Sequence, residues 1–343
     1  MVRVSDIRPE IVDAHNDLLL EVAFREFRRG EVDPFGNYWL QHLRAGGVAL
    51  QVCALYADLP TLPEGALREV LRLIAAYERA VRQHEDEVVP VRTRADLDVV
   101  KGGSRLGLML ALEGAEPLGY DPWMAEVFVA LGVRMIGLTW NRRNPFADGA
   151  AEEGTGGLSA LGQQLVDICR ERQVVLDVAH ASERTFWDVL ERLEGAPVVC
   201  SHAACRSVFD HPRNLNDEQL RGLADAGGVL GIMQHPINVD HERPTIDRVI
   251  DHLEYAVEVM GIEHVGLGSD FTRQAVRAVG WVEPMDTLLP PSMRADAAIE
   301  GLAGPQDFPN LVRALRRRGF EGSRLESVLG ANLLRVFHEA LPA

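Results

Sequence analysis

Short apolar runs alternate with longer amphipathic segments along this chain. Eight runs are mostly continuous rather than alternating, which is the pattern of strands buried on both faces. They cover residues 11–14, 48–56, 106–112, 133–140, 174–179, 197–201, 229–233 and 264–268. Five segments between the runs have apolar residues three to four positions apart, which predicts helices: 64–84, 158–172, 182–193, 217–226 and 245–260. This alternation predicts a parallel sheet with crossover helices.

Eight such units without a change in composition favour one closed (β/α)8 TIM-like barrel over an open, doubly wound sheet. We expect residues 1–343 to form a single domain. Ser182, with Thr185 nearby, and Asn216 are the expected helix N-caps. Two long loops are predicted, over residues 141–157 after the fourth run and over 271 to about 307 after the eighth. Loops of this length usually serve as binding loops or lids.

The runs end in residues that could do chemistry. His15 and Asp17 follow the first run, and residues two apart share a face of a strand. Glu113, His180 and His202 end three later runs. Each alone has an ordinary explanation: a capped turn at His15, an ion pair from Glu113 to Arg134 or Arg142, and hydrogen-bonded core histidines. Because a barrel gathers the C-terminal ends of its strands on one face, the set together predicts a site for two divalent metals.

Two further residues could act beside such a metal site. Asp270, after the eighth run, could take a proton from a metal-activated water, although an aspartate after glycines is often only a cap or turn residue. Arg213, after the sixth run, could clamp a substrate carboxylate or a developing oxyanion, although taken alone it would be an ordinary surface arginine. His235 follows the seventh run, and we interpret it as structural or substrate-facing.

Some other motifs argue against alternative chemistries. The segment 154–159 resembles a phosphate cradle, but no strand directly precedes it and no Gly-Lys-Ser/Thr follows. No Gly-x-Ser-x-Gly elbow supports a serine nucleophile.

Composition narrows the class of protein. The chain has 35 Lys and Arg against 51 Asp and Glu, a net charge of −16, so nucleic acid and anionic membranes are not expected partners. The four cysteines form no Cys-x-x-Cys pair, which indicates neither a disulfide framework nor a zinc ribbon. No signal-like stretch starts the chain and no run approaches the roughly 20 apolar residues of a spanning helix. We therefore expect a cytoplasmic protein.

Over nearly its whole length the sequence resembles the renal (membrane) dipeptidase family of zinc peptidases, among the amidohydrolase-like metal barrels. The resemblance rests on segments that occur in family order: Asp13-Ala14-His15-Asn16-Asp17, residues 43–48 leading to Gln51, Leu112-Glu113-Gly114, Leu138-Thr139, Ala147-Asp148, residues 177–182, Ser201-His202 through Arg213-Asn214, Gly268-Ser269-Asp270-Phe271, and residues 330–336.

The resemblance implies one zinc ion held by His15, Asp17 and Glu113, and a second held by Glu113, His180 and His202. It also implies that Arg213 binds the substrate carboxylate or supports the tetrahedral intermediate, and that Asp270 passes a proton to the leaving amine. The implied substrate is a dipeptide with a free C-terminal carboxylate, whose C-terminal residue could be D. The family also suggests a homodimer.

Two positions depart from the family pattern. Trp140 stands where the mammalian enzymes have a histidine after Leu-Thr, and an indole has one donor and no charge. In the family this histidine stabilises the oxyanion. We hypothesise that Asn141 or Arg142 takes over that role at the substrate and that the Arg142-Arg143 pair favours acidic dipeptides. Thr272-Arg273 replaces a frequent Asp-Gly. The alternatives are a metal-dependent amidohydrolase acting on another amide or a lactone, and a catalytically weak relative that binds peptides.

Overall fold

Eight parallel strands close into a barrel. The computed structural model describes residues 10–343 except 58–60, 104, 153, 155 and 281–292. The order β1-β2-β4-β5-β6-β7-β8-β9 returns to β1 through pairing of Asp13 with Leu267. These strands are Ile11–Asn16 (β1), Val48–Tyr56 (β2), Leu106–Glu113 (β4), Val133–Gly137 (β5), Val175–Asp177 (β6), Val198–Ala203 (β7), Val229–Ile232 (β8) and Val265–Leu267 (β9). The predicted (β/α)8 barrel is confirmed.

One strand was not predicted. Val88–Pro90 (β3) pairs in parallel with the first half of β4, with Val88 opposite Leu106 and Pro90 opposite Leu108. β2 pairs with one edge of β4. On the other edge, β3 pairs with residues 106–108 and β5 pairs from Leu110 onward. A run of three residues that ends in proline is too short to give a sequence signal.

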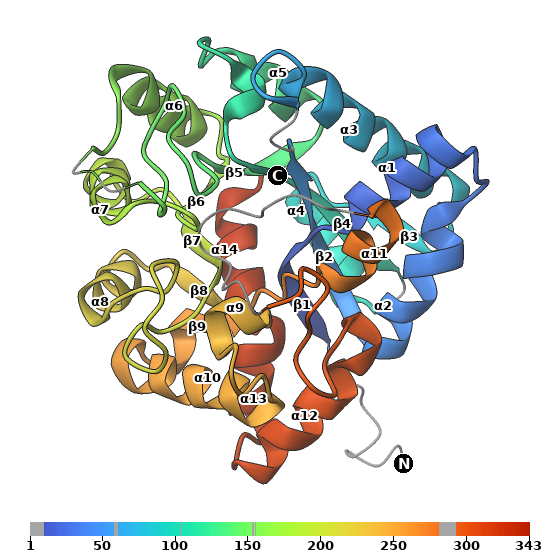
Figure 1. The fold of residues 1–343 in the computed structure, drawn as a ribbon, viewed down its shortest axis with the longest axis vertical. Helices are drawn as coiled ribbons and strands as arrows, with labels where there is room; N and C mark the ends of the chain where they lie inside the picture. The colour runs from blue at the N-terminus through green and yellow to red at the C-terminus, as the bar shows by residue number, and fades with distance from the viewer. Residues whose placement is uncertain (1–9, 58–60, 104, 153, 155, 281–292) are drawn as a thin grey trace.

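Helices pack around the barrel (Figure 1). The described helices are Leu18–Arg29 (α1), Gln41–Gly46 (α2), Ala66–Gln83 (α3), Arg94–Lys101 (α4), Met124–Ala130 (α5), Ala160–Glu171 (α6), Glu183–Arg192 (α7), Asp217–Asp225 (α8), Pro236–Val239 (α9), Ile246–Met260 (α10), Arg273–Val279 (α11), Phe308–Arg317 (α12), Gly322–Glu326 (α13) and Asn332–Ala340 (α14). All five predicted helices are present. Ser182 and Asn216 cap α7 and α8 as expected, each accepting a hydrogen bond from a backbone N–H in the first turn.

The two long-loop predictions fared differently. The described residues of 141–157 form no helix, and Gly149 makes an isolated bridge to Ala181. The prediction of a loop after the last strand is wrong in part. Arg273–Val279 forms α11, with Ala275, Val276 and Ala278 buried, and a short 3-10 turn covers Pro305–Asp307. Within this segment, residues 281–292 lie outside the described part.

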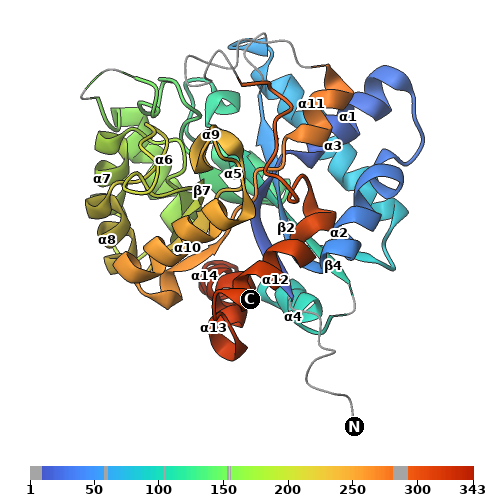
Figure 2. The ribbon, with the colours of Figure 1, turned by 60° about the horizontal axis from the view of Figure 1, so that its bottom comes forward.

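The C-terminal helix closes one end of the barrel. Leu333, Val336 and Phe337 of α14 join a buried cluster with side chains from the strands, such as Val12 and Val52. Figure 2 shows α14 and α4 at the lower end of the molecule, and α9 and α11 at the other. The C-terminal ends of the strands lie at the end of the barrel opposite α14. Parallel barrels place their active sites at these strand ends.

Some sequence expectations concern properties beyond the fold of one chain. In the described part of the chain, none of the helices has both the length and the apolar character required to cross a bilayer. The single domain over 1–343, the cytoplasmic location and the homodimer stay predictions.

His252 on α10 joins the segment that follows β7 to the end of α9. Its Nδ1 accepts the N–H of Cys205 at 3.0 Å, and its Nε2 donates to the carbonyl of Val239 at 2.9 Å. The side chain is fully buried. Replacement by Leu leaves both backbone groups unpaired, so we expect His252→Leu to lose roughly 2–4 kcal/mol of unfolding free energy, measured by urea denaturation.

The loss caused by His252→Leu should depend on pH. Burial lowers the pKa of His252 from 6.5 to about 4, so protons bind preferentially to the unfolded chain. The contribution of the neutral imidazole is complete above pH 6.5 and is lost as the pH falls toward 4. The stability difference between wild type and variant should shrink from pH 7 to pH 5. An equal difference at both pH values would contradict this account.

Candidate functional site

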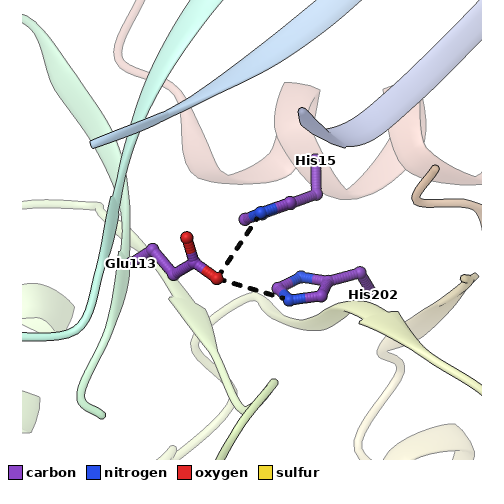
Figure 3. A group of neighbouring side chains, drawn as sticks. All are labelled: His15, Glu113 and His202. Carbon is purple, nitrogen blue, oxygen red and sulfur yellow. Dashed lines mark ion pairs between the residues drawn. The ribbon is translucent and has the colours of Figure 1, made fainter. Parts of the chain in front are cut away.

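Four strand ends bring their imidazoles and carboxylates to one point. His15 lies in β1, Glu113 ends β4, His180 follows β6 and His202 lies in β7. Glu113 Oε1 lies 3.0 Å from His180 Nε2 and 3.6 Å from each of the Nε2 atoms of His15 and His202. Figure 3 shows the carboxylate of Glu113 facing the rings of His15 and His202.

Two more carboxylates complete the cluster on the side of His15. Its Nε2 lies 4.0 Å from Asp17 Oδ1 and 3.8 Å from Asp270 Oδ1. The candidate ligand atoms form two groups, and within each group all atoms lie within 4.8 Å of one another. One group is His15, Glu113 and His202, and the other is His15, Asp17 and Asp270. Arg134 donates to the backbone carbonyls of Arg92, Val129 and Val133 and does not pair with Glu113.

Unusual backbone geometry aims two of these side chains. His180 and Asp270 have positive φ angles of 63° and 53°, a strained region for residues with a side chain. The N–H just before each is held by a buried carboxylate: Asp177 accepts from Ala179 at 2.9 Å, and Asp13 accepts from Ser269 at 2.7 Å. The N–H of Asp270 also bonds the carbonyl of His15 at 3.1 Å. These bonds fix the backbone from which the functional side chains project.

The donor set fits divalent cations. His15 Nε2 and Asp17 Oδ1 are buried and have no hydrogen-bond partner. The Nε2 atoms of His180 and His202 lie only 2.8 Å apart, both beside Glu113. His180 Nδ1 meets Asn141 Oδ1 at 2.7 Å, so that nitrogen is the donor and Nε2 of His180 keeps its lone pair. Imidazole nitrogen and carboxylate oxygen are ligands of zinc.

The electrostatics of the cluster also call for positive charge. Burial raises the pKa of Glu113 and of Asp17 well above their usual values, and neighbouring carboxylates raise them further. Burial, with a smaller effect of Arg213, lowers the pKa of His15 to about 3. Burial also raises the pKa of Asp270 to about 7. Several buried carboxylates around neutral imidazoles form a site that a cation stabilises.

A cleft of about 560 Å³ opens over the cluster. Asp17, Glu113, His180 and Asp270 border it, and so does Arg213, whose Nη2 donates to the carbonyl of His202 at 2.9 Å. Its other lining residues are Tyr56, Trp140, Asn141, His211, Met233, His235, Ile237, Asn238 and Thr272. The buried Nε2 of His235 has no partner. The sequence did not indicate Tyr56, His211, Met233, Ile237 or Asn238 as site residues, although Tyr56 and Met233 end apolar runs.

The residues that replace the family histidine occupy different places. Trp140 lies between two rings of the cleft: its ring centroid is 5.3 Å from that of Tyr56 and 5.7 Å from that of His180. Asn141 lines the cleft and contacts His180. Arg142 is half-buried and is not among the residues that line the cleft. Arg143 pairs with Asp148 through two bonds of 2.5 and 2.9 Å, and it is not among the residues that line the cleft.

Comparison with known proteins places the chain among dipeptidases. Residues 5–287 match the family described as membrane dipeptidase, peptidase family M19. "Dipeptidase verJ" of Clonostachys rogersoniana is 30% identical over 273 residues, covering 79% of this chain and 65% of its own length. "Dipeptidase ataJ" of Aspergillus terreus is 28% identical over 381 residues, covering 99% and 87%.

A solved structure has the same fold. It is a metallo peptidase from Rhodobacter sphaeroides liganded with a phosphinate mimic of the dipeptide L-Ala-D-Ala. The TM-score is 0.83 at 23% identity, over 96% of this chain and 99% of that one. The family match over most of the sequence decides the assignment: the chain belongs to the membrane dipeptidase family, peptidase family M19, and is a metallopeptidase of that family.

Proposed function

We propose that this protein is a binuclear zinc dipeptidase that cleaves dipeptides with a free C-terminal carboxylate, including those with a C-terminal D-residue. The observation that carries the proposal is the crowding of three imidazole nitrogens around Glu113, beneath a cleft that Arg213 and Asp270 border. The L-Ala-D-Ala mimic bound by the Rhodobacter sphaeroides protein supports the inclusion of D-residues.

The ligands divide into two sets that share Glu113. His15, Asp17 and Glu113 would hold one zinc ion, and Glu113, His180 and His202 the other. When bound, the two ions supply Lewis acidity toward the scissile carbonyl and lower the pKa of water so that hydroxide is available at neutral pH.

Arg213 and Asp270 act on the substrate. Arg213 is nearly buried and borders the cleft, where its guanidinium would hold the substrate's carboxylate and place the peptide bond over the cluster. Asp270 has a pKa raised by burial to about 7. Beside the cluster, its carboxyl group would accept a proton from the attacking water and return it to the leaving amine.

The cleft walls shape the choice of side chains. Tyr56, Trp140, Met233 and Ile237 present aromatic and aliphatic surface. Arg143, one of the two arginines expected to favour acidic dipeptides, is paired with Asp148. We therefore propose that neutral side chains suit this cleft at least as well as acidic ones. Asn141 lines the cleft, and its contact with His180 Nδ1 orients that proposed metal ligand.

Removing one ligand should remove one metal ion. We expect His202→Ala to bind one zinc ion per chain instead of two and to show no measurable turnover, because the second set then keeps only two ligands. Metal analysis after dialysis and a dipeptide assay measure this. His84→Ala, which removes an imidazole bound to Asp33 outside the cleft, is the control and should keep both ions. Two ions in His202→Ala would contradict the ligand assignment.

The role of Arg213 can be separated from general damage to the site. Wild type should cleave a dipeptide with a free carboxylate about 100-fold more efficiently than its C-terminal amide, as expected for two charge-assisted bonds. In Arg213→Met this ratio of kcat/KM should fall close to one, whatever the absolute rates. A ratio that stays at the wild-type value would remove Arg213 from carboxylate recognition.

A substrate panel tests the reaction class. We expect hydrolysis of L-L and L-D dipeptides, with no preference for acidic over neutral side chains, and no hydrolysis of cyclic amides or lactones. Product amines are quantified with zinc-loaded enzyme. Cleavage of cyclic amides or lactones without dipeptide hydrolysis would favour the amidohydrolase alternative. Binding without turnover of any of them would favour the peptide-binding one.

A further inference from the structure

Behind His202 lies a buried chain of hydrogen bonds that leads away from the cleft. Ser201 Oγ donates to Asp177 Oδ2 at 2.5 Å and lies 2.7 Å from His202 Nδ1. All three residues are buried. A serine hydroxyl has a single proton, so it can donate to only one of these two neighbours.

The surroundings of Asp177 decide which neighbour receives that proton. Its Oδ1 accepts the N–H groups of Ala179 and Ser201, both at 2.9 Å, while Oδ2 accepts the hydroxyl. Three donors directed at one carboxyl group favour the ionised form, which can only accept. The hydroxyl proton of Ser201 therefore goes to Asp177, and the oxygen of Ser201 is left to accept from His202.

We propose that Asp177 and Ser201 are positioning residues that hold His202 as the tautomer protonated on Nδ1, which leaves Nε2 free to bind a cation. The inference rests on the proposed function for the identity of that cation. His180 reaches the same state by another route, since its Nδ1 meets Asn141 Oδ1 at 2.7 Å. Both Nε2 lone pairs then face Glu113, only 2.8 Å from each other.

The barrel contains a matched pair that lacks the ring contact. Asp13 accepts the N–H and the hydroxyl of Ser269 at 2.7 and 2.5 Å, as Asp177 does for Ser201. Ser269 Oγ, however, lies 3.2 Å from the backbone carbonyl of His15 and not beside an imidazole nitrogen. This second pair holds backbone, so it controls for the loss of a buried serine hydroxyl.

Asp177→Asn tests the proposal by reversing the chain of donors. The two backbone N–H groups keep the amide oxygen in the place of Oδ1, so the amide nitrogen donates to Ser201 Oγ. Ser201 must then donate to His202 Nδ1, which transfers the ring proton to Nε2. Two-bond ¹⁵N–¹H correlation spectra of histidine-labelled, metal-free protein should show Nδ1–H in wild type and Nε2–H in Asp177→Asn. Zinc affinity should fall by about 10–100-fold, measured by competition with a chelator.

Two serine variants complete the test. Ser201→Ala should leave His202 in a mixture of both tautomers, and it serves as the readout if Asp177→Asn does not fold. Ser269→Ala should keep His202 in the Nδ1–H form. A wild-type spectrum in Ser201→Ala or Asp177→Asn, or His202 protonated on Nε2 in wild type, would overturn the proposal. Because the tautomer is read without zinc or substrate, this result is independent of whether the protein hydrolyses dipeptides.

Discussion

The structure depends on one electrostatic constraint: Glu113, Asp17 and Asp270 are carboxylates buried within a few ångströms of three neutral imidazoles. Their side chains are only 10–11% exposed, and burial, together with neighbouring carboxylates, raises their pKa values. Charges in such a place are stable only with a cation or a partner. The same constraint makes the site suitable for metal-assisted hydrolysis. The carboxylates that a bound cation would stabilise border the cleft, so the cation would lie beside a substrate bound there.

Holding these groups at fixed positions requires a rigid frame. His180 and Asp270 lie in the left-handed backbone region, which costs of order 1–3 kcal/mol each. The closed barrel can support this strain because its strands are buried on both faces and α14 seals the opposite end. Asp13 and Asp177 anchor the backbone just before the strained residues. The strained residues thus lie at the same strand ends as the proposed metal ligands, as is usual at functional sites.

Selectivity has a different physical basis from catalysis here. In the proposed function, the cluster and Arg213 determine where the peptide bond is placed, while the walls of the cleft decide which side chains fit. Trp140 contributes ring surface between Tyr56 and His180 rather than charge. Asn141 faces His180, and Asp148 engages Arg143. Trp140 therefore shapes the wall of the cleft and is not part of the cluster of candidate ligands.

The sequence by itself determined the barrel, because eight apolar runs and the amphipathic segments between them have periods that only strands and helices satisfy. It also determined the candidate ligands, since His15, Glu113, His180 and His202 are the polar residues that interrupt or end buried runs. It missed β3 and nine of the fourteen described α-helices, among them α1, α11, α12 and α14. The three residues of β3 and the seven of α11 give too little periodicity.

Only the tertiary structure decided how these residues are used. Loops that fold over the strand ends decide whether Arg143 faces the cleft or Asp148. They also decide whether the side chain of Asn141 contacts His180. The pairing of Asp177 with Ser201, and of Asp13 with Ser269, joins positions 24 and 256 residues apart. The first contact arises where β6 pairs with β7, and the second where β9 closes the barrel against β1. No local pattern in the chain records either pairing.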